Sequence, residues 1–183
     1  RAAFMFLEPG SMPPVGLAYI GVHMIFEIKM ENFQFKARLV ANGNETGTPT
    51  SLTYASVVSR ESVRIALMLA ALNGLEVKTS DIENAYLTAP TQEKLYTKLG
   101  PEFGPDEGQF AVIVRALYGT KSAGASFRNH LAECMLYLGY ESCKADPDVW
   151  IRPAMKSNGF KYWEIILYYV DDLLCIHEDP TIA

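Results

Sequence analysis

The apolar positions of this chain fall into short runs separated by polar and glycine-containing segments, a pattern typical of short strands mixed with a few helices. Residues 23–30 and 35–40 are rich in β-branched and aromatic residues, which predicts two strands joined as a hairpin through Glu31 and Asn32. The composition of residues 42–49 predicts a loop. Residues 9–14 read Pro-Gly-Ser-Met-Pro-Pro, so residues 1–14 are expected to form an irregular lead-in or linker.

Two segments have helical signals. Ser59 is a candidate N-cap and Asn73-Gly74 a stop, so residues 63–72 are predicted to be helical. Because apolar residues surround this helix on nearly all sides, we expect it to be central and buried. A second helix is predicted from apolar residues at intervals of three or four, ending at Gly139; they are Phe127, Leu131, Met135 and Leu138. Helices and short antiparallel strands together indicate an α+β class.

Two adjacent acids, Asp171 and Asp172, interrupt the apolar stretch of residues 165–176. Residues 165–170 and 173–176 read as two buried strands, with the acids as the tight turn between them. Asn158-Gly159 predicts a hairpin that feeds the first of these strands. An isolated Asp-Asp pair can simply close a hairpin, because aspartate bonds its own backbone in turns.

A second acid, Asp81, ends a strand-like segment far away in the sequence. Residues 75–81 alternate in polarity, and Asp81 has the parity of Leu75 and Val77. An acid at the end of an apolar face is costly without a partner. If this strand lies beside the hairpin, three carboxylates converge on one sheet edge. Such an oxygen-rich site suits Mg²⁺ or Mn²⁺, and two-metal phosphoryl transfer requires an edge of this kind.

Composition limits these possibilities. At 183 residues and 49% hydrophobic content, the chain can bury one substantial core, as one domain or as two lobes. No apolar run reaches the ~20 residues needed to cross a bilayer, and no secretory signal is evident, so no membrane association is expected. Three cysteines without metal-ligand spacing fit buried thiols in a reducing, intracellular setting.

The net charge of −5 argues against a free-standing nucleic-acid binder, because phosphate contacts need clustered Lys and Arg. The charge is compatible with nucleic-acid binding if the acids concentrate at a metal site and other domains hold most of the duplex.

Several motifs resemble one family. Residues 81–86 (Asp-Ile-Glu-Asn-Ala-Tyr) followed by residues 169–172 (Tyr-Val-Asp-Asp) resemble the palm of a reverse transcriptase. The segments at 36–41, 54–58, 84–87, 116–119 and 145–150 occur in the order used by copia-type retrotransposons. The resemblance covers about residues 12–180.

The resemblance implies a right-hand polymerase fold with a palm and fingers but no thumb. Residues 15–183 would form one reverse transcriptase domain, truncated at its C-terminus. Within it the fingers would comprise about residues 15–75 and 91–118, and the palm about residues 76–90 and 119–183.

The resemblance also implies site residues. Asp81, Asp171 and Asp172 would be the catalytic carboxylates that bind Mg²⁺, or Mn²⁺, with Asp172 the weaker ligand. The backbone carbonyl of Ile82 would complete the oxygen shell. Glu83 has the strand parity of Asp81, but the family does not use it as a ligand, and a solvated acid is expected there.

Further residues are expected to contact the nucleotide and the primer. Tyr86 would block a ribose 2′-hydroxyl, with an ordinary core aromatic as the alternative. Lys36 and Arg38 would neutralise the triphosphate, with a solvated strand face as the alternative. The remaining expected contacts are the backbone amides near Asn84 and Ala85 for the triphosphate, Tyr169 for the primer terminus and Val170 beneath the incoming sugar.

One departure concerns the segment after Gly119. Ser122 stands where most copia-type sequences carry a glutamine that positions the nucleotide, and Phe127 stands where they carry a tryptophan. Some branches have a Lys-Ser pair at this point. Ser122 is therefore the candidate for this nucleotide contact.

The expected function is that of an RNA-directed DNA polymerase domain in a copia-type retrotransposon polyprotein. Its partners would be a primed RNA or DNA template, deoxynucleoside triphosphates and other polyprotein segments, in the cytoplasm within retrotransposon particles. The alternatives are a catalytically silent remnant and a metal-dependent nuclease or phosphatase. Because the chain ends at Ala183, residues 1–183 alone are expected to polymerise poorly and to expose an apolar strand edge at 173–176.

Overall fold

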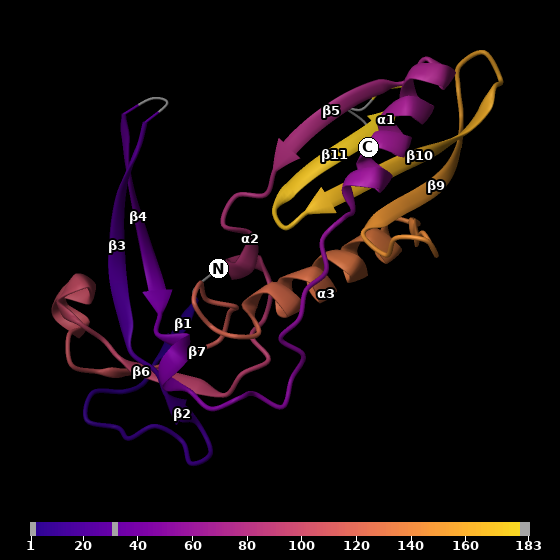
Figure 1. Cartoon of the computed structure of the whole chain (residues 1–183). Coiled ribbons are helices and arrows are strands. Elements are labelled where there is room, and N and C mark those ends of the chain that lie inside the picture. The colour runs from indigo at the N-terminus through magenta and orange to yellow at the C-terminus, as the bar shows by residue number, and fades with distance from the viewer. Residues whose placement is uncertain (1–2, 31–32, 180–183) are drawn as a thin grey trace. The chain divides into compact units, whose positions relative to one another are not determined.

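The computed structural model describes residues 3–30 and 33–179 and divides into two compact units (Figure 1). Unit 1 comprises residues 1–54 and 86–127, and unit 2 comprises residues 55–85 and 128–183. Several sheets and few helices confirm the expected α+β class. In the described part of the chain no helix is long and apolar enough to cross a membrane.

Unit 1 contains a four-stranded sheet in the order β1-β7-β6-β2. Its strands are β1 (Phe4–Phe6), β2 (Ala18–Tyr19), β6 (Leu95–Lys98) and β7 (Phe110–Ile113). The core beside this sheet contains Ile20, Ala41, Leu95, Ile113 and Leu117. The irregular lead-in expected for residues 1–14 therefore contains a strand, because β1 pairs with β7.

The predicted hairpin of unit 1 is confirmed as β3 (Val22–Lys29) and β4 (Gln34–Ala41), which pair antiparallel along their whole length. The proposed connecting residues Glu31 and Asn32 lie outside the described residues. Three short helices complete the unit's connections. They are η1 (Gly43–Glu45), α2 (Ala85–Thr88), which begins at the unit boundary, and η2 (Pro101–Asp106).

Unit 2 is built on a five-stranded antiparallel sheet in the order β5-β11-β10-β9-β8. The strands are β5 (Glu76–Asp81), β8 (Glu141–Ser142), β9 (Val149–Met155), β10 (Lys161–Tyr169) and β11 (Asp172–His177). The Asn158-Gly159 hairpin joins β9 to β10 as predicted. The expected exposed edge at residues 173–176 is wrong, because β11 lies between β10 and β5.

The first predicted helix, α1 (Arg60–Asn73), has the expected ends. The Ser59 hydroxyl accepts a hydrogen bond from the Ser62 amide, and Gly74 closes the helix in the left-handed conformation. Ala66 and Ala70 pack against the sheet, close to Ile165, Leu167 and Ile176.

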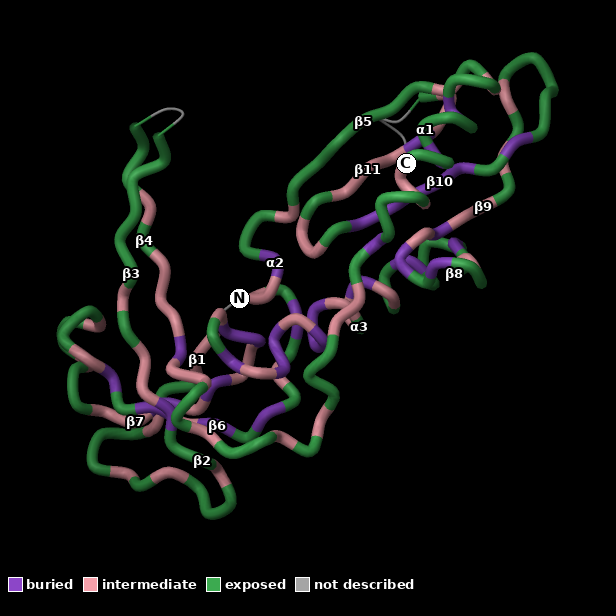
Figure 2. The backbone as a smooth tube through the Cα atoms, in the orientation of Figure 1, coloured by how far each residue is buried: buried purple, intermediate pink, exposed green. Residues whose placement is uncertain are grey.

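The expectation that α1 is buried all round is wrong, because most of its residues are exposed and are coloured green in Figure 2. Ile65 and Met68 are each 54% exposed and Leu72 is 74% exposed. Only one side of α1 meets the sheet, so the apolar side chains on its other side have no protein layer over them among the described residues of unit 2.

The second predicted helix is α3 (Ala123–Tyr137), and Gly139 follows it with a φ of 82°. Phe127, Leu131 and Met135 are buried, as their spacing predicted, but the prediction is wrong for Leu138, which lies beyond the end of the helix and is 52% exposed. The boundary between the two units falls within this helix, after Phe127. Cys134 on α3 is exposed, so the expectation of buried thiols is wrong for this cysteine.

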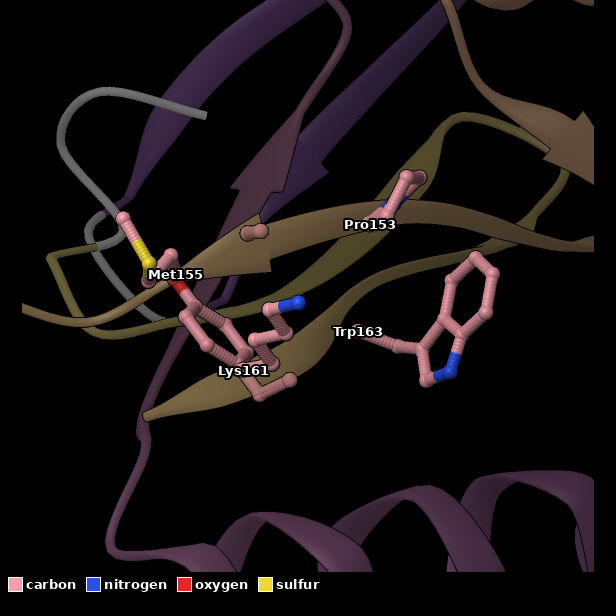
Figure 3. Close-up of a pocket in the computed structure, with 6 residues that line it drawn as sticks. Pro153, Met155, Lys161 and Trp163 are labelled. Carbon is pink, nitrogen blue, oxygen red and sulfur yellow. The ribbon is translucent and has the colours of Figure 1, made fainter. Parts of the chain in front are cut away.

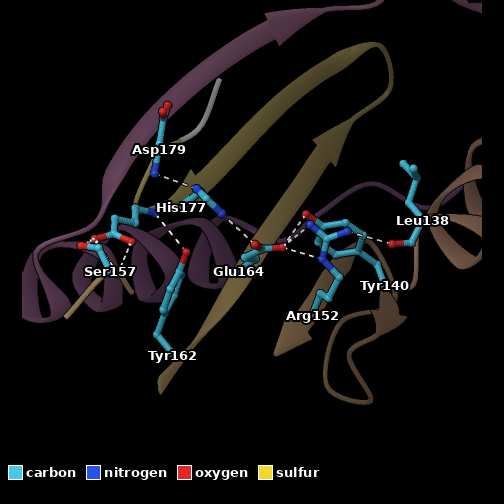
Figure 4. A network of polar contacts seen from close by, with 9 residues as sticks. Leu138, Tyr140, Arg152, Ser157, Tyr162, Glu164, His177 and Asp179 are labelled. Carbon is cyan, nitrogen blue, oxygen red and sulfur yellow. Dashed lines mark hydrogen bonds and ion pairs between the residues drawn. The ribbon is translucent and has the colours of Figure 1, made fainter. Parts of the chain in front are cut away.

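A buried carboxylate ties together the strands of unit 2 (Figure 4). Glu164 on β10 is 5% exposed and accepts hydrogen bonds from Arg152 on β9, at 2.6 Å, and from the Tyr140 hydroxyl, at 3.0 Å. Its other oxygen lies 2.7 Å from Nε2 of His177 on β11. Burial and the charge of Glu164 raise the pKa of Tyr140, so this hydroxyl stays protonated and donates. The network links β9, β10 and β11.

A second carboxylate, Asp146, anchors the start of α1 to the segment before β9. It accepts hydrogen bonds from the Ser59 amide at 2.9 Å, the Ser62 hydroxyl at 2.7 Å and the Asp148 amide at 3.1 Å. Burial acts to raise the pKa of this carboxyl, but the hydrogen bonds outweigh burial and hold the pKa below its ordinary value of 3.8.

Two glycines in unit 1 allow two backbone segments to cross. The Ala41 amide donates to the Tyr118 carbonyl at 2.7 Å. A Cβ atom added to Gly43 would overlap the Gly119 carbonyl oxygen, and one added to Gly119 would overlap the Ala41 carbonyl oxygen. The end of β4 can therefore approach residues 118–119 only because both positions lack side chains.

We expect Asp146→Asn to lower the free energy of unfolding by about 1–3 kcal/mol at neutral pH, because buried donors lose their charged acceptor. The folded pKa is depressed, so this stabilisation is present above pH 3.8 and is lost as the pH falls through the folded pKa. Urea unfolding of both proteins as a function of pH measures the difference, with Asp106→Asn in unit 1 as the control. A difference that persists unchanged to the lowest pH would contradict the assignment.

We expect Gly43→Ala to destabilise unit 1 by about 1–3 kcal/mol or more, because the obstructing atom is a backbone oxygen. Gly47→Ala is the matched control, since no atom lies within 4 Å of the point where a Cβ would stand at that position. That control should stay within about 0.5 kcal/mol of the parent protein. Equal thermal unfolding temperatures for the two variants would refute the backbone crossing.

Candidate functional site

The pairing of β11 with β5 brings two candidate carboxylates face to face. Asp172 is the register partner of Asp81. The Ile82 amide donates to the Asp171 carbonyl at 2.9 Å, which makes 82 and 171 a hydrogen-bonded pair. The neighbouring pair, Asp81 and Asp172, is then of the non-hydrogen-bonded type, in which opposite side chains lie closest. Like charges directly opposite each other destabilise a sheet unless a cation separates them.

Asp171 lies in the turn beside this pair. The loop between β10 and β11 consists of Val170 and Asp171, so the predicted turn is displaced by one residue and Asp172 opens the second strand. Val170 has a φ of 59°, a conformation that β-branched residues rarely adopt. The chain thus holds a strained residue directly before the paired acids, and such strain is typical of functional sites.

The donor set suits a divalent cation only in part. Asp81 and Asp172 are exposed and Asp171 is half-buried, so solvent and a ligand can reach all three. Among residues 3–30 and 33–179, no group of three or more His, Cys, Asp or Glu side chains is placed to hold a metal ion. Two opposed carboxylates fit a hard cation. The third carboxylate, Asp171, belongs to the turn, and its side chain would have to turn toward those of Asp81 and Asp172 to share a cation with them.

Tyr169 completes a row across three strands of the sheet. It pairs with Asp172, which pairs with Asp81, so the three side chains share one face. Tyr169 is 56% exposed. The preceding residue, Tyr168, points to the opposite face and is buried. The exposed tyrosine is therefore the one available to a ligand at this end of the sheet.

The residues after Asp81 leave the strand immediately. Asn84 adopts a left-handed φ of 53°, and Ala85, which is 1% exposed, begins α2. The predicted contact of their backbone amides with a triphosphate stays a prediction. The Ile82 amide donates its hydrogen bond to the Asp171 carbonyl. The proposed role of the Ile82 carbonyl as a metal ligand likewise stays a prediction.

Lys36 and Arg38 lie in unit 1 and share one face of β4, as their spacing predicted. Lys36 is opposite Glu27 and Arg38 is opposite Ile25. Arg38 forms a 3.1 Å ion pair with Glu27, and the two side chains are 40% and 47% exposed. Pairs of this kind contribute roughly 0–1 kcal/mol, so an anionic ligand could replace Glu27 at small cost.

Tyr86 and Ser122, also in unit 1, have different surroundings. The Tyr86 ring is half-buried and lies against Tyr118 and Phe127. Ser122 is 0% exposed, and its amide and hydroxyl both donate to Glu93, at 2.8 and 2.7 Å. Glu93 thus holds Ser122 directly before α3, and the predicted contact of Ser122 with a nucleotide stays a prediction.

Sequence reasoning missed the buried carboxylates that support these elements, namely Glu93, Asp146, Asp148 and Glu164. A signal existed for Glu164, which follows Trp163 and precedes the apolar run of 165–167. A carboxylate next to a run of buried apolar residues needs hydrogen-bond or ion-pair partners, because burying an unpaired charge is costly. The same argument singled out Asp171 and Asp172, and it applies equally to Glu164.

A separate hollow of about 590 Å³ lies at the other end of β10 (Figure 3). It is lined by Pro153, Ala154, Met155, Lys161, Tyr162 and Trp163. No carboxylate lines it and none of the candidate residues belongs to it, so it adds nothing to the acidic edge.

Comparison with known proteins agrees with the motifs. The chain matches the family model described as reverse transcriptase (RNA-dependent DNA polymerase) over residues 9–183. It is 29% identical over 178 residues to the retrovirus-related Pol polyprotein from transposon RE1 of Arabidopsis thaliana, covering 93% of this chain and 12% of that protein. No solved structure matches the chain.

Two further relatives come from other organisms. The Pol polyprotein from transposon TNT 1-94 of Nicotiana tabacum is 28% identical over 174 residues, covering 91% of this chain and 13% of that protein. The transposon Ty1-NL2 Gag-Pol polyprotein of Saccharomyces cerevisiae is 28% identical over 147 residues, covering 79% of this chain and 8% of that protein. The chain thus spans between 8% and 13% of the length of these curated relatives.

We expect Val170→Gly to raise the free energy of unfolding by about 0.5–1 kcal/mol. Relief of the positive φ, worth roughly 1–3 kcal/mol, outweighs the added chain entropy of glycine. Val77→Gly is the matched control on β5, where the backbone is unstrained, and it should destabilise by up to about 1 kcal/mol. Urea denaturation of the three proteins checks the prediction. Equal losses in both variants would mean that Val170 carries no strain.

Proposed function

The chain belongs to the reverse transcriptase (RNA-dependent DNA polymerase) family, and we propose that it catalyses template-directed joining of deoxynucleotides to a primer 3′-hydroxyl. It would do so within the polyprotein of a copia-type retrotransposon, the class to which its relatives belong. The observation that carries this proposal is the register pair of Asp81 and Asp172, with Asp171 beside it in the turn.

Asp81, Asp171 and Asp172 would hold Mg²⁺, or Mn²⁺, together with the Ile82 carbonyl oxygen. The bound ions would neutralise the charge that develops on the transferring phosphoryl group. The protein's part is to keep the carboxylates in position before the substrate arrives. The paired strands fix Asp81 and Asp172, and the side chain of Asp171 would join them from the turn.

The other residues would bind and orient the substrates. Lys36 and Arg38 would contact the triphosphate, with Arg38 exchanging Glu27 for phosphate oxygens. Backbone amides at Asn84 and Ala85 would assist, and Tyr86 would exclude the ribose 2′-hydroxyl. Tyr169 would meet the primer terminus and Val170 the incoming sugar. We assign Ser122 a supporting role only, because Glu93 holds it.

In this proposal unit 1 corresponds mainly to fingers and unit 2 mainly to the palm. The expected division grouped residues 60–73 with the fingers, whereas α1 packs on the sheet of unit 2. The proposed partners are a primed RNA or DNA template, deoxynucleoside triphosphates and other polyprotein segments, within cytoplasmic retrotransposon particles. Because the relatives are many times longer, activity is proposed for the longer polyprotein rather than for residues 1–183 alone.

A catalytically silent remnant is the second candidate. Two observations favour it: the described carboxylates form no cluster of three, and Ser122 is enclosed. A nuclease or phosphatase is less well supported, because it would leave the shared face of Lys36 and Arg38 and the spacing of Tyr86 from Asp81 without a role.

Substitution of the acids tests the proposal in the longer polyprotein that carries this chain. We expect Asp81→Asn and Asp171→Asn each to reduce Mg²⁺-dependent primer extension by at least about 10³-fold, because charge neutralisation at the reacting phosphate is lost. Glu83→Gln is the matched control, since Glu83 is exposed and two residues from Asp81.

Thermal unfolding of the same variants separates loss of chemistry from loss of fold. Asp81→Asn should leave the unfolding temperature unchanged or higher, because it removes repulsion with Asp172. Extension that survives in Asp81→Asn would contradict the proposed chemistry. Absence of extension in the parent polyprotein would favour the silent remnant.

A further inference from the structure

The Tyr86 ring is the central member of a three-ring cluster in unit 1. Its centroid lies 4.8 Å from that of Tyr118, with the planes inclined by 33°, and 5.9 Å from that of Phe127, with the planes inclined by 52°. We propose that Tyr118 and Phe127, here called the aromatic clamp, are positioning residues that hold Tyr86 where it can exclude a ribose 2′-hydroxyl. This inference rests on the proposed function.

Tyr86 needs external support because its own helix is very short. The four residues of α2 (Ala85–Thr88) make a single turn, which has little stability by itself. Its backbone is held instead by the segment that leads to Tyr118. Arg115 donates from Nη1 to the Thr88 carbonyl at 3.1 Å, and the Ala116 amide donates to the Ala89 carbonyl at 3.0 Å. The segment that fixes the backbone of α2 therefore also delivers the Tyr118 ring.

The Phe127 side chain and the Tyr118 backbone are held by parts of unit 1 other than Tyr86. Phe127 is 3% exposed and belongs to α3. The Tyr118 carbonyl accepts the 2.7 Å hydrogen bond from Ala41, the last residue of β4, and Gly119 follows with a φ of 90°. Tyr118 thus contacts two elements. Its backbone is hydrogen-bonded to β4, the strand that carries Lys36 and Arg38, and its ring lies against Tyr86 of α2.

The geometry is suited to restraining rotation of the Tyr86 side chain. Ring pairs at centroid separations of 4.5–7 Å attract one another beyond simple burial. A half-buried tyrosine packed against two rings has fewer rotamers open to it, and loss of one ring makes more of them accessible. Steric exclusion of a single hydroxyl depends on position to within about 1 Å. Loosening the clamp should therefore affect the ribonucleotide far more than the deoxynucleotide.

The test is single-nucleotide extension by the longer polyprotein that carries this chain, measured as kcat/KM for a deoxynucleotide and for the matching ribonucleotide. Tyr118→Leu keeps an apolar side chain but removes the ring, and Tyr118→Phe keeps the ring. We expect Tyr118→Leu to reduce the deoxy-to-ribo ratio about tenfold, by raising ribonucleotide use, and Tyr118→Phe to retain the parent ratio.

Two further variants calibrate the measurement. Tyr86→Ala gives the full loss of discrimination and should exceed the effect of Tyr118→Leu. Tyr96→Leu is the matched control, because Tyr96 is also half-buried in unit 1 and contacts two rings, Tyr19 at 5.6 Å and Phe110 at 5.8 Å. It should leave the ratio unchanged, even if stability falls.

The outcomes separate the inference from the proposed function. If Tyr86→Ala lowers the ratio but Tyr118→Leu does not, or lowers both rates equally, the clamp is refuted and the role of Tyr86 stands. If Tyr86→Ala leaves the ratio unchanged, both the sugar-selecting role and the clamp are refuted. A fall with Tyr96→Leu as large as that with Tyr118→Leu would reduce the clamp to general packing.

Discussion

The antiparallel pairing of β5 with β11 is the constraint on which the candidate site depends. Asp81 and Asp171 are separated by 171 − 81 = 90 positions, and only this pairing makes the acids neighbours. The register is fixed by burial, because Leu174 and Ile176 share the face of Asp172 and pack beneath α1. A shift by one residue would turn these apolar side chains to the other face of the sheet. The hydrophobic core thereby determines which acids face one another.

The acidic end of the sheet combines features that oppose folding. Two like charges are paired across strands, and a valine adopts a positive φ in the turn. Elsewhere in the same sheet, the Glu164 carboxylate accepts hydrogen bonds from Arg152 and Tyr140 and pairs with His177. A fully satisfied buried network of this kind specifies one arrangement of strands. Strain at one end of β10 is therefore tolerated because the rest of the strand is held by its neighbours, as is common at functional sites.

In unit 1 the candidate side chains are held in position by different contacts. Its candidate residues lie on a two-stranded hairpin and a one-turn helix, and neither is stable by itself. The ends of these elements are held by neighbouring segments. The contacts are the hydrogen bonds of Ala41 and Ala116, the close approach of Gly43 to Gly119 and the hydrogen bonds of Ser122 to Glu93. The aromatic clamp adds a constraint on the side chain itself. Local supports of this kind let short elements hold side chains in defined positions.

The sequence by itself determined the elements and much of the chemistry. Caps at Ser59 and Gly74, the Asn158-Gly159 hairpin and the acids within apolar runs are local signals, because they depend on residues that are adjacent along the chain. The tertiary structure decided which surfaces are covered and which residues are opposed. It left one side of α1 exposed, gave β11 a second neighbour and enclosed Ser122 with Glu93. It also placed Asp172, rather than Asp171, opposite Asp81. Periodicity could not foresee these outcomes, because strand register and burial depend on side chains that are distant in the sequence.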